Sequence, residues 1–176
     1  LWIDPTGTLW LFWAQSDGKY DGRAGVWCIT TADPVSADPE WSEPRRIANG
    51  IMMNKPIVLS TGEWAFPTAV WIKEPHLPEF ADERHSNALV SGDEGATFTL
   101  RGGAEVPGRA FDEHMIVERK DGSLWCLVRG KEFGIGESVS EDGGRTWSPG
   151  KPAGIPGPST RFHIRRLSSG KLLLVY

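Results

Sequence analysis

This sequence of 176 residues has no long hydrophobic run, few cysteines and no excess of basic residues, and each of these absences excludes a class of protein. The longest apolar run covers residues 172–176, far below the roughly 20 residues that a membrane-spanning helix needs. With 19 Lys and Arg against 23 Asp and Glu, the chain offers no basic surface for nucleic acid. Its two cysteines, Cys28 and Cys126, lie in separate apolar stretches and make no disulfide framework. We therefore expect no membrane span, no nucleic-acid partner and no cystine scaffold.

Turn-forming and aromatic residues, in contrast, are plentiful. The sequence contains 21 Gly, 13 Pro and 9 Trp, a mixture that disfavours long helices and favours short strands joined by tight turns. These features predict an all-β fold. Because the chain begins at Leu1 in strand-like sequence and stops at Tyr176 inside an apolar run, we also expect it to be a piece of a longer protein.

One octet occurs twice, at residues 91–98 and 140–147, 49 residues apart. Both copies read Ser-x-Asp-x-Gly-x-Thr-aromatic. The Asp and hydroxyl side chains are suited to bonding nearby turn amides, and the glycine permits a tight bend, so we expect a structural role and not a calcium loop. The residues concerned are Ser91, Asp93, Gly95, Thr97 and Phe98, and then Ser140, Asp142, Gly144, Thr146 and Trp147.

A second repeated unit consists of two strands joined by a turn that ends on glycine. These glycines recur every 48 to 60 residues, at Gly7, Gly62, Gly122 and Gly170. Glycine suits them because hairpin turns need a positive φ. Each period holds about four short strands, which is the size of one β-propeller blade.

The sequence thus predicts a partial β-propeller. We expect blades at about residues 1–48, 53–103 and 111–151, and the start of a fourth blade at 160–176. Closed propellers need roughly four to eight blades, so these units are too few to close a ring. Self-association and a smaller two-sheet β fold are the alternatives.

The repeated octet resembles the Asp-box of the sialidase (neuraminidase) superfamily and of related BNR-repeat proteins, and the sialidases among them are six-bladed propellers. Residues 111–129 carry a more specific likeness. They resemble a bacterial sialidase segment in which a Glu precedes an Asp-Gly turn and an Arg follows it. The resemblance implies an exo-glycoside hydrolase that removes terminal sialic acid or a related acidic sugar from glycans, without cofactor or metal, in a secreted or periplasmic location.

The same resemblance implies two catalytic residues. In the family the Glu partners the catalytic Tyr, and the Arg belongs to a triad that grips the substrate carboxylate; the matching positions are Glu113 and Arg129. A phenol with a pKa near 10 needs a base beside it, and Arg binds a carboxylate through two parallel hydrogen bonds. We expect the Tyr, the general acid Asp and the other triad arginines to lie outside the chain, so that this piece alone is inactive.

The residues themselves place this pair together. If residues 120–122 form a three-residue hairpin loop, Glu113 faces Arg129 across the hairpin. A two-residue loop would instead set His114 opposite Arg129. Counting from the turn glycine, the equivalents in the second blade are Met53 and Ala69, so the scaffold does not demand a charged pair.

Further candidates surround this pair. Arg161, which shares one strand face with His163 and Arg165, is a candidate for substrate binding, and so is His114 beside Glu113. His76 and His85 lie in a long insertion around residues 73–84, which we expect to form a loop over the blade rim. No histidine spacing indicates a metal site.

Two other functions remain open. One is a different propeller enzyme on acidic polysaccharide, a lyase or rhamnosidase-like protein that uses a histidine such as His114. The other is a non-catalytic Asp-box propeller that binds glycan or protein.

Overall fold

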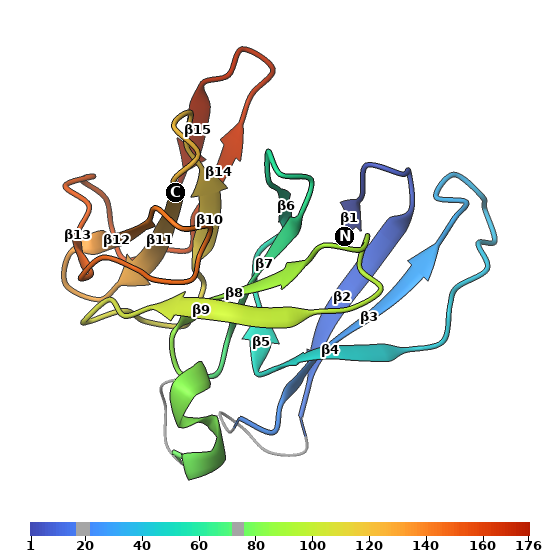
Figure 1. Ribbon diagram of the computed structural model, residues 1–176, viewed down its shortest axis with the longest axis horizontal. Helices are drawn as coiled ribbons and strands as arrows, with labels where there is room; N and C mark the ends of the chain where they lie inside the picture. The colour runs from blue at the N-terminus through green and yellow to red at the C-terminus, as the bar shows by residue number, and fades with distance from the viewer. Residues whose placement is uncertain (17–21, 72–75) are drawn as a thin grey trace.

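The computed structural model describes residues 1–16, 22–71 and 76–176, in which the regular structure consists almost entirely of short β-strands (Figure 1). The strands build four antiparallel sheets that follow one another along the chain. Within the described residues the only helix is η1 (Pro78–Glu83), a 3-10 helix in the insertion where we expected a loop, and no helix there is suited to crossing a membrane. The all-β prediction is confirmed.

The first two sheets take up residues 2–104. The first pairs its strands in chain order, and they are β1 (Trp2–Ile3), β2 (Leu9–Gln15), β3 (Gly25–Thr31) and β4 (Arg45–Asn49). The second has the order β5-β7-β8-β9, with β6 also paired to β7. Its strands are β5 (Ile51–Met52), β6 (Ile57–Val58), β7 (Trp64–Ala69), β8 (Ser86–Ser91) and β9 (Thr99–Ala104).

The third sheet and a final hairpin complete the fold. The third sheet again pairs in chain order, and its strands are β10 (Met115–Glu118), β11 (Leu124–Gly130), β12 (Gly134–Ser140) and β13 (Lys151–Pro152). The hairpin pairs β14 (His163–Arg166) with β15 (Leu172–Val175). Three blade-like sheets and one hairpin are thus present; the predicted blade limits, which include connecting turns, stay predictions.

The first strand of the second sheet is split in two. Ile51 faces Ala69 and Ile57 faces Ala65, so residues 53–56 oppose only residues 66–67. These extra residues include Pro56, which has no N–H to donate to a ladder. The split shifts the register, and Ala69 faces Ile51 instead of the Met53 reached by counting.

Four hairpins close on the predicted turn glycines. The φ angles are 92° at Gly7, 87° at Gly62, 85° at Gly122 and 79° at Gly170. A Cβ added at any of these positions would meet no atom within 4 Å. The positive φ, and not a lack of space, therefore selects glycine at these turns.

Aromatic side chains fill the space between the first and second sheets. Trp10 and Trp64 are buried, and Trp64 makes edge-on contacts with Trp2 at 4.9 Å and with Trp10 at 5.8 Å between ring centres. Phe66 meets Phe98 of the first octet at 5.2 Å. Such edge-to-face contacts are favourable beyond the apolar area that they bury. Trp10 and Trp64 are therefore core residues.

Both octets form the same hydrogen-bonded turn. In the first, the Asp93 carboxylate accepts bonds from the Ser91 hydroxyl at 2.8 Å and from the Thr97 amide and hydroxyl at 2.8 and 2.6 Å. These bonds lower the pKa of Asp93 to about 2. In the second, Asp142 accepts the matching bonds from Ser140 and Thr146, which also lower its pKa.

An arginine from the preceding sheet also contacts each octet turn. Arg45 of β4 donates to the Gly95 carbonyl at 2.6 Å, and Arg101 of β9 donates to the Gly143 carbonyl at 3.3 Å. Arg101 also pairs with Glu63, the residue just before β7. The octet turns therefore join neighbouring sheets as well as neighbouring strands.

Candidate functional site

Glu113 and Arg129 meet at the end of the third sheet where β10 begins and β11 ends. Met115 faces Leu127 and Val117 faces Trp125, the register that the three-residue loop predicts. Glu113 lies just before β10, and its Oε2 atom is 3.1 Å from Nη1 of Arg129. The predicted juxtaposition is confirmed, and the two-residue alternative, which set His114 opposite Arg129, is wrong.

The Arg129 side chain is held on several sides and is still partly open. Besides Glu113, Nη2 donates to the Ser159 carbonyl at 2.9 Å and Nε to the Ser159 hydroxyl at 3.4 Å. The Phe111 ring lies over the guanidinium, with 4.1 Å between Cζ and the ring centre. Among the described residues these contacts use three of the five N–H groups, and 19% of the side chain is exposed. Arg129 therefore keeps donors for a ligand.

The backbone around Glu113 is fixed by residues that the sequence analysis missed. Asn54, in the split of the second sheet, donates its amide to the carbonyls of Glu113 at 2.8 Å and His114 at 3.1 Å. Just before Glu113, Phe111 and Asp112 have φ angles of 62° and 49°. Non-glycine residues in this region are uncommon, and they gather at functional sites.

A buried ion pair supports this strained segment. Nε of Arg109 lies 3.0 Å from Oδ1 of Asp112, and both side chains are almost fully buried. The Ala110 amide donates to the Arg129 carbonyl at 2.7 Å, and Arg109 also donates to the Arg84 carbonyl. In the sequence, only the three-residue spacing of Arg109 and Asp112 hints at this ion pair. That spacing brings side chains together in a helix, and no helix forms here.

His114 turns away from this pair into the interior. It is 1% exposed, and its Nε2 lies 2.9 Å from the Asn87 carbonyl of β8. Burial lowers the pKa of His114 to about 4; the charge of Arg109 acts in the same direction, and the bond to Asn87 opposes it. A neutral, enclosed imidazole has no surface with which to touch a substrate, and this placement does not favour the histidine-based lyase alternative.

The other predicted candidates have partners of their own. Arg161 is exposed and donates to the Met53 carbonyl, beside the Asn54 that contacts Glu113. Phe162 and Ile164 are buried while Arg161, His163 and Arg165 are exposed, so the predicted alternation is confirmed. His85 lies 3.3 Å from the carboxylate of Glu105. No group of three His, Cys, Asp or Glu suited to a metal occurs in the described part of the chain.

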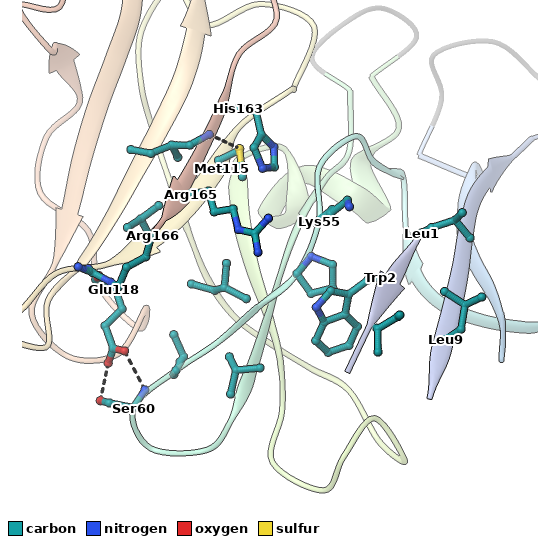
Figure 2. Close-up of a pocket in the computed structure, with 17 residues that line it drawn as sticks. Leu1, Trp2, Leu9, Lys55, Ser60, Met115, Glu118, His163, Arg165 and Arg166 are labelled. Carbon is teal, nitrogen blue, oxygen red and sulfur yellow. Dashed lines mark hydrogen bonds between the residues drawn. The ribbon is translucent and has the colours of Figure 1, made fainter. Parts of the chain in front are cut away.

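A groove of about 850 Å³ runs along the first strands of all four sheets, β1, β6, β10 and β14, and it contains neither Glu113 nor Arg129. Figure 2 shows Lys55 and Arg165 extending into it near His163. Burial lowers the pKa of His163, and the charges of Lys55, Arg165 and Arg161 lower it further. The first strands of the sheets therefore share one groove that carries several cationic side chains.

Comparison with known proteins identifies the repeat and the fold. The profile described as "BNR repeat-like domain" matches residues 1–176. The K499G mutant of NanB sialidase from Streptococcus pneumoniae superposes with a TM-score of 0.63 at 20% identity, and the match covers 86% of this chain and 23% of that chain. NanB in complex with 2-[(3-chlorobenzyl)ammonio]ethanesulfonate gives a TM-score of 0.61 at 21% identity over the same shares.

A protein of unknown function from Dyadobacter fermentans aligns at 15% identity and a TM-score of 0.47, covering 97% of this chain and 71% of that chain. Among curated protein sequences, none matches. The four antiparallel sheets match part of a sialidase propeller, and this chain spans less than a quarter of the length of each of these NanB sialidase chains.

Proposed function

Because this chain belongs to the BNR repeat-like domain family, we propose that it supplies part of the site of a sialidase-like exo-glycoside hydrolase that acts on a terminal acidic sugar. The observation that carries the proposal is the pairing of Glu113 with Arg129 at 3.1 Å, at a partly open end of the third sheet. The sialidase fold of the superposed structures supports the same assignment.

In this proposal Arg129 binds the carboxylate of the sugar. Its guanidinium is already oriented by Ser159 and Glu113, so little side-chain freedom is lost when a ligand binds. The N–H groups left over are suited to a carboxylate, which Arg binds through charge-assisted hydrogen bonds.

Glu113 acts as the base. Sialidases are exceptional glycosidases in that their nucleophile is a tyrosine, and a neighbouring carboxylate is suited to take the phenolic proton. We assign no tyrosine of this chain to that role. Tyr176 donates its hydroxyl to the Pro156 carbonyl at 2.6 Å, and Tyr20 lies outside the described residues.

Arg161 is proposed as a second cation for the acidic sugar. It precedes the turn Gly170 by the same nine residues that separate Glu113 from Gly122. Its contact with Met53, the residue next to Asn54, supports a location close to Glu113. His114 is left out of the proposed site because it is buried.

The test measures hydrolysis of a fluorogenic sialoside by the protein in its natural length. We expect Glu113→Ala to lower kcat by about a hundredfold or more, because the reaction loses its general base. Arg129→Ala should raise KM strongly, because the carboxylate of the substrate loses its hydrogen bonds to the guanidinium.

Glu137→Gln is the matched control. Glu137 lies in the same sheet and is similarly buried, but it accepts a bond from Trp125 and pairs with Lys151. This variant should keep full activity. Failure of the wild type to hydrolyse or bind sialosides would refute the substrate class, and binding without hydrolysis would make the protein a glycan-binding propeller. Full activity of Glu113→Ala would refute the assigned base.

A further inference from the structure

Phe111 is a large apolar side chain in an open position beside the Glu113–Arg129 pair. It is 51% exposed, and its ring centre lies 4.1 Å from Cζ of Arg129. At this distance the face of the ring attracts the guanidinium charge. The guanidinium carbon therefore lies over the face of the ring, while much of the Phe111 side chain stays open to solvent.

The position of Phe111 is built into the backbone. Phe111 and Asp112 both have positive φ, which persists in non-glycine residues only where contacts impose it. The buried Arg109–Asp112 pair and the bond from Ala110 to the Arg129 carbonyl are those contacts. They fasten the segment that carries the ring to the strand that carries Arg129.

Two of the five N–H groups of Arg129 are not used by Glu113 or Ser159. All five lie in the plane of the guanidinium, so a ring that packs on the face of that plane leaves these two open to a ligand. Water that would otherwise solvate this face is displaced, and a less polar surrounding strengthens a charge-assisted hydrogen bond. This effect strengthens the binding of a charged ligand group that lies in the plane of the guanidinium.

We propose that Phe111 is a positioning residue that acts through Arg129, orienting and partly desolvating the guanidinium so that it binds a carboxylate edge-on. The inference rests on the proposed function, which names an acidic sugar as the ligand. It requires that Phe111 contribute to binding only when the carboxyl group of the ligand is charged.

The experiment compares N-acetylneuraminic acid with its methyl ester as ligands of the protein in its natural length, by NMR titration. Phe111→Ala should weaken binding of the acid about fivefold and change binding of the ester less than about twofold. Phe111→Tyr keeps the ring and should bind the acid as the wild type does. In an Arg129→Lys background, the effect of Phe111→Ala should shrink, because an ammonium has no plane to orient.

Trp41→Ala removes another exposed aromatic, in the connection before β4, and should alter neither affinity. Thermal unfolding checks that each variant is folded. If Phe111→Ala binds the acid as tightly as the wild type, or loses acid and ester equally, the inference is overturned while the proposed function stands. If the wild type binds neither ligand, both are overturned.

Discussion

The second and third sheets share one repeat but differ at the end where their first strands begin. Counted from the turn glycine, Glu113 and Arg129 of the third sheet correspond to Met53 and Ala69 of the second. In the second sheet the first strand is split into β5 and β6, and Ala69 is fully buried opposite Ile51. In the third sheet the charged pair is partly open to solvent. The scaffold therefore folds without the pair, which supports a role beyond stability.

The strongest way to break this comparison is to put the arginine into the second sheet. We expect Ala69→Arg to destabilise the fold by about 3 to 5 kcal/mol, because Ala69 is fully buried and the repeat position that holds Glu113 in the third sheet holds Met53 here. Urea unfolding measures the loss. Ala14→Arg is the matched control, at the same repeat position of the first sheet but exposed, and it should change stability by less than about 0.5 kcal/mol. Equal losses in the two variants would mean that burial does not distinguish the positions.

A second prediction concerns the next repeat position, which holds Asn54 in the second sheet and His114 in the third. The pKa of His114 falls from 6.5 to about 4 on folding, so between these values the unfolded chain binds the proton more readily. Stability should therefore decrease as the pH falls from about 6.5 towards 4. His114→Asn should flatten that slope in urea unfolding.

The matched control for this slope is His85→Asn. The His85 imidazole is partly exposed beside Glu105, and its replacement should leave the decrease in place. A slope that survives in His114→Asn would show that another group titrates in this range.

The smallest expected effect concerns a feature that the two sheets share. Asp93 and Asp142 both have lowered pKa values, so their contribution is complete above the unfolded value of 3.8 and is lost as the pH falls towards about 2. Asp93→Asn and Asp142→Asn should each reduce the acid sensitivity of unfolding within that window, and by similar amounts. A large effect of one and none of the other would show that the two octets are not equivalent.

Much of the fold follows from local chemistry that the sequence displays. The turn at Gly122 and its three-residue loop determine which residues of the hairpin face each other, so the register that brings Glu113 to Arg129 was predictable. The octets were predictable for the same reason, because the bonds of Asp93 and Asp142 reach only two to four residues along the chain.

The sequence by itself thus determined the all-β class, the repeating hairpins and the pairing of Glu113 with Arg129. Only the tertiary structure decided the surroundings of that pair, because they come from distant segments. Ser159 is 30 residues from the Arg129 that it contacts, and Asn54 is 59 residues from Glu113. The Asn87 carbonyl that is hydrogen-bonded to the His114 ring belongs to another sheet. The buried Arg109–Asp112 pair and the strained Phe111 have no repeating pattern to reveal them. Local periodicity specifies strands and turns, whereas burial and long-range contacts specify which side chains face a ligand.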